Sequence, residues 1–253
     1  MKVTILGSGT STGVPMVGCT CRVCSSDDPR DNRTRASLLI RHDSRTILID
    51  TSTDFRRQAL RERLASIDAV LFTHSHADHV NGIDDLRGFH FAHRRIVPCF
   101  ASSTASEILL TAFPYIFNEI EGSGYTPIMH LNEIRGPFDL FGLNVTPIPL
   151  VHGLTTTMGY RIGSFAYLTD CNAIPAASLS LLQGLDVLVI DGLRWKPHPF
   201  HFHIEAAIAA AEQLNPRRTI LTHLSHDVLH ADSGKLPQGV EFAYDGLKFT
   251  SIP

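Results

Sequence analysis

The sequence has no long hydrophobic run, no excess of basic residues and no low-complexity or linker-like segment. The first absence argues against a membrane-spanning helix, which needs about 20 consecutive apolar residues. A formal net charge of −3 over 253 residues leaves no broad basic surface for a long nucleic acid, so any recognition of phosphate has to be local. With 43% hydrophobic and 19% charged residues, the composition predicts one compact domain over residues 1–253 and argues against disorder.

The N-terminal segment MKVTILGSGTSTG carries one lysine and an apolar run that stops at Gly7. This run is too short for the hydrophobic core of a signal peptide. We therefore expect a cytoplasmic protein without membrane contact. The sequence does not define the oligomeric state, and a homodimer is one open alternative.

Cysteine is scarce, and three of the five cysteines lie within the short segment GCTCRVC, as Cys19, Cys21 and Cys24. In a reducing compartment such a cluster binds a metal ion more often than it forms disulfides. Three reduced cysteines without a metal are the alternative. Cys99 and Cys171 stand alone and are expected to be ordinary buried residues.

Short runs rich in β-branched residues, bounded by glycine, aspartate or proline, predict strands in both halves of the chain. They cover residues 3–6, 37–41, 46–49, 69–72, 96–100, 143–149, 157–161, 165–168, 187–190, 219–221 and 247–250. Helices are predicted over 54–64, 103–112 and 203–214. Two β-rich halves with helices outside predict an α/β fold in which two sheets pack face to face.

Several predicted strands end in the same way, with an apolar run followed by a residue of metal-binding or acid–base type. These residues are Asp50, His74, Asp170, Asp191 and His223. The carboxyl ends of buried strands lie along one edge of a sheet, where α/β enzymes build their sites. Imidazole and carboxylate groups together suit Zn²⁺, Mn²⁺ or Fe²⁺, and the full set exceeds what one tetrahedral ion needs.

The segment THSHADH, residues 73–79, is the densest part of this pattern. It contains His74, His76, Asp78 and His79. No single regular helix or strand places all four side chains on one face, so we expect a loop that converges them on one point. Histidines without such neighbours are expected to be ordinary surface or core residues, namely His42, His90, His93 and His130.

This segment, followed at increasing distance by LVHG, LTD and LTHLSH, resembles the metallo-β-lactamase superfamily of binuclear metallohydrolases. The resemblance covers almost the whole chain and implies a four-layer αββα sandwich. It implies one ion held by His74, His76 and His152, a second held by Asp78, His79 and His223, and Asp170 bridging the two. Asp50 is then expected to orient a ligand histidine, with a helix N-cap role as the alternative.

The opening GSGTSTGVP, the cysteine segment and the closing THLSH are similar to a narrower branch of the superfamily. That branch contains the cyclic-phosphate phosphodiesterase of bacterial phosphonate breakdown and lies close to the tRNA 3′-processing endonucleases. The likeness implies a separate structural zinc ion held by Cys19, Cys21, Cys24 and His226. The sequence has no long arm rich in glycine and proline of the kind that grips tRNA, which favours a small substrate.

The resemblance therefore implies a phosphodiesterase with two divalent ions, zinc or manganese with iron as a further option, in which a metal-bound hydroxide attacks phosphorus. A cyclic nucleotide or cyclic sugar phosphate is the expected substrate, and a nucleoside monophosphate is the expected product or ligand. Asp78 belongs to the expected catalytic set. So does a histidine that binds phosphate or protonates the leaving group, for which His201 aligns best and His203 is the rival.

Two other functions and one further element stay open. A thioester or lactone hydrolase would use the same ions on a neutral carbonyl, and a non-catalytic module would bind only a metal or nucleotide. The aromatic residues of segment 113–135 could cover a base or sugar, although local packing is the alternative. They are Phe113, Tyr115, Phe117 and Tyr125.

Overall fold

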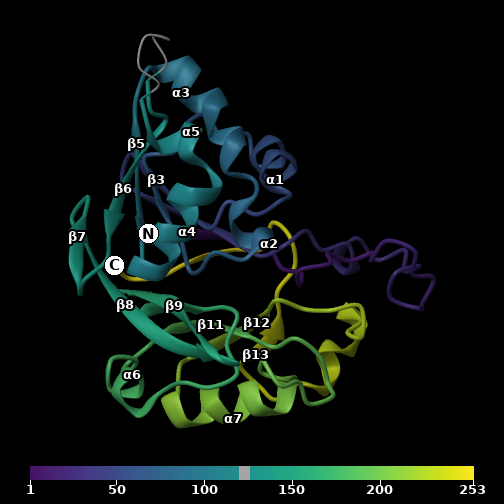
Figure 1. Cartoon of the computed structure of the whole chain (residues 1–253). Coiled ribbons are helices and arrows are strands. Elements are labelled where there is room, and N and C mark those ends of the chain that lie inside the picture. Colours follow the sequence, from purple (N-terminus) through teal and green to yellow (C-terminus); the bar gives the residue numbers. More distant parts are fainter. Residues whose placement is uncertain (120–125) are drawn as a thin grey trace.

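The computed structural model describes residues 1–119 and 126–253, and these residues form two seven-stranded sheets between outer helices (Figure 1). The first sheet has the order β14-β1-β2-β3-β4-β5-β6. Its strands are β1 (Lys2–Gly7), β2 (Ser37–His42), β3 (Arg45–Ile49), β4 (Ala69–Leu71), β5 (Val97–Ala101), β6 (Met129–Glu133) and β14 (Lys248–Thr250). The predicted α/β, αββα sandwich is confirmed.

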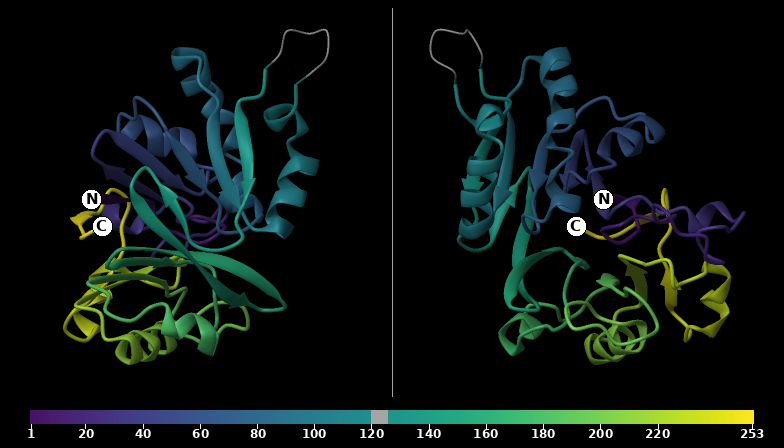
Figure 2. Two further views of the ribbon diagram at one scale, coloured as in Figure 1. Left: turned by 90° about the vertical axis from the view of Figure 1, so that its left-hand side faces the viewer. Right: turned by 45° about the vertical axis from the view of Figure 1, so that its right-hand side comes forward.

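The second sheet has the order β13-β12-β11-β10-β9-β8-β7. Its strands are β7 (Phe138–Leu140), β8 (Leu143–His152), β9 (Thr155–Ile162), β10 (Phe165–Leu168), β11 (Val187–Asp191), β12 (Arg218–Thr222) and β13 (Val240–Phe242). In the views of Figure 2 the two ends of the chain lie close together, because β1 pairs with β14 and Ser251 N donates to Met1 O at 3.1 Å.

Helices cover the outer face of each sheet (Figure 1). On the first sheet lie α1 (Phe55–Arg61), α3 (Arg87–His93), α4 (Ser103–Ala112) and α5 (Pro114–Phe117), and on the second lie α6 (Ala176–Ser180) and α7 (Ile204–Leu214). Shorter elements are α2 (Ala77–Val80) and the 3-10 helices η1 (Pro29–Asp31), η2 (Ile83–Leu86) and η3 (His230–Lys235). Among the helices of the described ranges, none is long and apolar enough to cross a membrane.

The central strands are apolar on both faces because both faces are covered. In β2, Leu38 and Ile40 enter the core between the sheets, whereas Leu39 enters the core beneath the outer helices. In the sequence, strands that are buried on both faces appear as continuous hydrophobic runs and not as alternating hydrophobic and polar residues. This explains why the runs in the sequence locate the strands so well.

Parallel pairing brings the strand ends that carry polar residues together. In the first sheet β3, β4 and β5 run parallel, and in the second β10, β11 and β12 run parallel. The residues that follow these strands therefore collect at one edge of each sheet. That arrangement positions the site described below.

The described aromatic residues of segment 113–135 lie on the outer side of the first sheet. Phe113 and Phe117 pack against the outer core of the first sheet. The guanidinium of Arg87 lies over the ring of Tyr115, with 5.9 Å between Arg87 Cζ and the ring centroid. Tyr125 lies outside the described residues. The alternative of local packing therefore holds for the phenylalanines.

Candidate metal centre

Seven histidine and aspartate side chains meet where strands of the two sheets end: four from the segment after β4, His152 from the end of β8, Asp170 from after β10 and His223 from after β12. Their possible ligand atoms form two groups, in each of which all atoms lie within 4.8 Å of one another. One group is His74, His76, His152 and Asp170, and the other is Asp78, His79, Asp170 and His223. The structure thus brings together every residue expected to hold two active-site ions, in the two sets expected.

Asp170 is shared by both groups, and its two carboxylate oxygens face different partners. Oδ2 lies 3.7 Å from His74 Nε2. Oδ1 lies 3.2 Å from His79 Nε2 and 3.3 Å from His223 Nε2. A carboxylate placed in this way can bridge two cations, one on each side.

Hydrogen bonds at Nδ1 turn several of these rings so that Nε2 faces the centre. His79 Nδ1 donates to Asp50 Oδ2 at 2.7 Å, and His152 Nδ1 donates to the Phe200 carbonyl at 2.7 Å. Thr73 Oγ1 donates to Asp50 Oδ2 at 2.7 Å and lies 2.9 Å from His74 Nδ1. Such outer contacts hold a ring nitrogen in the orientation a metal requires.

Asp50 therefore serves both groups, directly through His79 and indirectly through Thr73. The prediction that Asp50 orients a histidine is confirmed. Its alternative role as a helix cap is wrong, because Asp54 is the residue that precedes α1.

The donor set fits a cation. Among the described side chains, buried atoms without a hydrogen-bond partner include His74 Nε2, Asp78 Oδ2, His79 Nε2 and His223 Nε2. A buried polar atom left unpaired costs about 1–3 kcal/mol. Four such atoms in the two ligand groups are explained by divalent cations, which would use all of them as ligands.

The electrostatics of the site agree with this reading. Burial alone would lower the pKa of His223, but the carboxylates of Asp170 and Asp78 raise it to about 9. Burial would also lower the pKa of His79, and Asp170, Asp50 and Asp78 instead raise it well above its usual range. The carboxylates thus create a field that favours positive charge.

Backbone strain marks the same positions. Asp50, Asp170 and His223 have φ angles of +62°, +53° and +60°, a region that residues other than glycine rarely adopt. Each follows the end of a strand, where the left-handed conformation turns the chain sharply. Such strained residues cluster at functional sites, where the surrounding structure holds them.

The segment 73–79 is only partly a loop. His74 and His76 precede α2, whereas Asp78 and His79 lie within it. The expectation of a continuous loop is therefore wrong. His76 is the N-cap residue and is exposed, so the centre is open to solvent on that side.

His201 reaches the centre, and its rival does not. The His201 ring stacks on His223 with centroids 4.7 Å apart, and its Nδ1 donates to Asp191 Oδ2 at 2.6 Å. His203 is the N-cap residue of α7 and makes no described contact with the cluster. The sequence pattern marks Asp191 as the end of a strand but indicates no partner for it.

The cysteine cluster forms a second, separate site. The sulfur atoms of Cys19, Cys21 and Cys24 and a ring nitrogen of His226 all lie within 4.8 Å of one another. The backbone N–H of Cys24 lowers the pKa of the Cys21 thiol to about 6, which favours the thiolate that zinc binds. The expected closed set is therefore assembled, and it ties the N-terminal loop to the segment after His223. Cys99 and Cys171 are buried as predicted.

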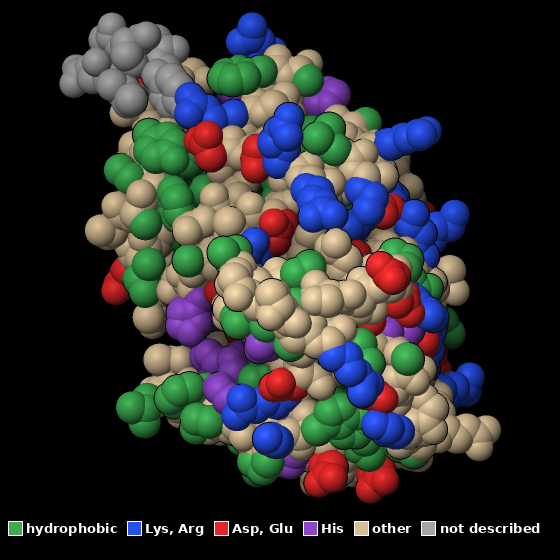
Figure 3. All heavy atoms as spheres, turned by 90° about the vertical axis from the view of Figure 1, so that its right-hand side faces the viewer, with side chains coloured by type: hydrophobic (Ala, Val, Ile, Leu, Met, Phe, Trp, Pro, Cys, Tyr) green, Lys and Arg blue, Asp and Glu red, His purple; other side chains and the backbone are tan. Residues whose placement is uncertain are grey.

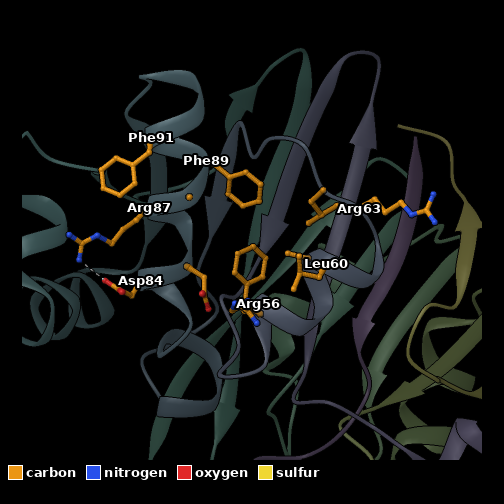
Figure 4. Close-up of a pocket in the computed structure, with 12 residues that line it drawn as sticks. Arg56, Leu60, Arg63, Asp84, Arg87, Phe89 and Phe91 are labelled. Carbon is orange, nitrogen blue, oxygen red and sulfur yellow. Dashed lines mark hydrogen bonds and ion pairs between the residues drawn. The ribbon is translucent and has the colours of Figure 1, made fainter.

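The ligand histidines lie apart from the pocket of Figure 4, which both apolar and charged side chains line. In Figure 3, histidine side chains gather on one side of the visible face, with hydrophobic side chains beside them. A pocket of about 670 Å³ lies elsewhere, between α1 and the segment η2–α3, where Leu60, Arg63, Phe89 and Phe91 line it (Figure 4). Its described lining includes no residue of either ligand group.

Two facing sheets with outer helices, and a histidine and aspartate cluster at their strand ends, define a metal-dependent hydrolase of the αββα class. The family model described as beta-lactamase superfamily domain matches residues 45–224. The chain belongs to that superfamily.

Several known proteins are similar to this chain. A crystal structure of a diphosphatase from the PhnP family shares 44% sequence identity with a TM-score of 0.92, covering 98% of this chain and 97% of that one. Zn²⁺-bound PqqB from Methylobacterium extorquens, at 21% identity and a TM-score of 0.81, covers 99% of this chain and 100% of its own and shares the fold.

A curated relative is longer than this chain. An octanoyltransferase from Porphyromonas gingivalis (strain ATCC BAA-308 / W83) is 44% identical over 254 residues. The match covers 98% of this chain and 51% of the octanoyltransferase. The chain thus spans about half the length of this relative.

Proposed function

We propose that the chain is a binuclear metal-dependent phosphodiesterase that hydrolyses small phosphodiesters. The observation that carries this proposal is the position of Asp170 between two groups of ligand atoms. A carboxylate shared in this way is suited to two cations about 3.5–4 Å apart, the spacing used by many phosphoryl-transfer sites. The mixed set of imidazole and carboxylate donors suits zinc, manganese or iron.

The two ions, when bound, supply Lewis acidity toward phosphate oxygens and activation of water. The residues of the chain orient the histidines that would hold these ions. Asp50 holds His79 directly and His74 through Thr73, so one buried carboxylate sets histidines of both groups. Asp78, whose carboxylate lies 3.3 Å from His79 Nε2, is the acidic member of the second group.

His201 is the residue that we propose for handling the proton of the leaving group. Asp191 is fully buried and holds His201 Nδ1 at 2.6 Å, which leaves Nε2 as the nitrogen available to a substrate. A positioned histidine of this kind can donate a proton to the leaving oxygen. We assign this role to His201. His203 is the N-cap residue of α7 and is given no catalytic role.

The similarity to a diphosphatase supports phosphorus chemistry and adds a close alternative substrate. A diphosphate contains a P–O–P bond, and the same arrangement of cations and a proton donor would serve it. The net charge of −3 favours a small substrate over a long nucleic acid.

Acyl chemistry is the competing function, and the octanoyltransferase relative is the observation that favours it. Because the match covers 51% of that protein, its acyl transfer is not assigned to this chain. A thioester hydrolase would need the same cations but no anionic substrate.

A three-substrate assay separates these functions. Protein purified without chelator is given bis(4-nitrophenyl) phosphate, ADP and an octanoyl thioester, with the Asp170→Ala variant as the matched inactive protein. We expect turnover of the diester, the diphosphate or both, lost in the variant. Turnover of the thioester alone would contradict the proposal.

A further inference from the structure

Four aromatic rings form a closed circuit beside the metal centre. The centroid distances are 4.7 Å between His201 and His152, 6.3 Å from His152 to Phe200, 5.9 Å from Phe200 to His198, and 5.2 Å from His198 back to His201. His152 and His201 already have roles in the centre. The side chains of Phe200 and His198 have none, although the His198 ring lies beside that of the proposed proton donor His201 and the Phe200 ring beside that of the ligand His152.

Two large apolar side chains that are close in sequence to residues of the centre are exposed. Phe200 is 47% exposed, and Leu154, two residues after the ligand His152, is 101% exposed. Scattered exposed apolar residues are normal on a protein surface. Phe200 and Leu154 differ from such residues because Phe200 directly precedes His201 in the chain and Leu154 lies two residues after the ligand His152.

Phe200 is held firmly in its place. Its carbonyl accepts the His152 Nδ1 hydrogen bond at 2.7 Å. Its ring lies over Gly153, where an added Cβ would stand 2.2 Å from the ring. A side chain that is packed on one face and exposed on the other presents a flat, preorganised platform, which costs little entropy when a ligand binds.

We infer that Phe200, with His198 and Leu154, forms the subsite for the organic part of the substrate, and that this part is a planar nucleobase. This inference rests on the proposed function and selects nucleotides over sugar phosphates. A base has a π face that stacks on aromatic rings whatever its identity. A sugar ring presents hydroxyl groups beside a smaller apolar face, so it gains less than a base from stacking on a phenyl ring.

Two cyclic phosphodiesters of matched reactivity test this inference. Adenosine 2′,3′-cyclic phosphate and glycerol 1,2-cyclic phosphate both contain a five-membered cyclic diester, but only the first carries a base. The measured quantity is the kcat/KM value for the adenosine compound divided by the kcat/KM value for the glycerol compound. We expect Phe200→Ala to lower this ratio about 10-fold, since stacking of one base typically contributes this much or more, and Phe200→Trp to retain it.

The controls separate a lost platform from a damaged centre. Phe91→Ala removes a phenylalanine of similar exposure, 56%, from α3, and it should leave the ratio unchanged. Phe200→Leu keeps bulk over Gly153 and repeats the test if the alanine variant loses metal. Damage to the centre lowers both kcat/KM values together, whereas loss of the subsite lowers their ratio.

The possible results distinguish a failure of the subsite inference from a failure of the proposed function. A ratio that falls in both Phe200→Ala and Phe200→Leu supports the subsite. A wild-type ratio in Phe200→Leu, with both substrates still cleaved, overturns it and leaves the phosphodiesterase standing. If the wild-type protein cleaves neither cyclic phosphate, the subsite inference fails, whereas the proposed function is decided separately by the three-substrate assay.

Discussion

His79 Nδ1 donates a hydrogen bond to Asp50 Oδ2 over 2.7 Å, and both side chains are completely buried. The bond leaves His79 Nε2 as the nitrogen that faces Asp170. Asp50 also accepts from the backbone and hydroxyl of Thr73. One carboxylate that follows β3 thus sets the orientation of ligands in the segment after the neighbouring strand β4.

Replacing Asp50 should weaken metal binding without removing a ligand. Asp50→Asn keeps the shape but loses the charge that holds His79, and we expect metal affinity to fall about 10–100-fold. Competition with a fluorescent chelator measures it. Asp139→Asn, at an exposed position of β7, is the control, and equal affinities in the two variants would contradict this role.

Two neighbouring histidines should respond differently to removal. His201→Ala should lower kcat about 10²–10⁴-fold, because a positioned proton donor is lost, while His203→Ala should change kcat little. Steady-state kinetics on the best substrate of the three-substrate assay provide the test. A larger loss in His203→Ala would reverse the assignment.

The cysteine site should be structural and independent of the active centre. Cys24→Ser should lower the metal content by one ion per chain, measured by elemental analysis, and leave the two other ions bound. Each kcal/mol lost lowers Tm by about 2–4 °C in a domain of this size, and we expect at least that fall. Cys99→Ala removes a cysteine from the outer core and should leave the metal content unchanged.

Gly153 should be more sensitive to alanine than another glycine of similar backbone conformation. Gly153 and Gly142 have φ angles of +60° and +81°, but an added Cβ meets the Phe200 ring at the first and open space at the second. Gly142→Ala should cost about 1–2 kcal/mol of unfolding free energy from backbone strain alone. Gly153→Ala should cost more and also lower kcat/KM, because displaced Phe200 no longer holds His152. Equal costs, with activity retained, would argue against this contact.

The sequence predicted the parts of the molecule that repeat a simple pattern. Strands β2, β3, β10 and β11 were located by continuous apolar runs, and α4 was predicted over the same residues, 103–112, that form it. The residues at the strand ends included three members of the ligand groups, His74, Asp170 and His223, whereas the full sets came from the resemblance to the superfamily.

Other features depend on tertiary packing and could not be predicted. Helix α2 spans four residues, which is too short for a periodic pattern. The pairing of Asp191 with His201 crosses a loop whose course no local rule defines. The left-handed conformation of His223 is imposed by its surroundings, since the residue type disfavours it.

The central claim is that Asp170 lies between two cations, and anomalous scattering from crystals of protein purified without chelator tests it most directly. The account predicts two anomalous peaks about 3.5–4 Å apart, one on each side of the Asp170 carboxylate, and a third at the cysteine site. Peaks at the cysteine site alone, with none beside Asp170 in active protein, would contradict it.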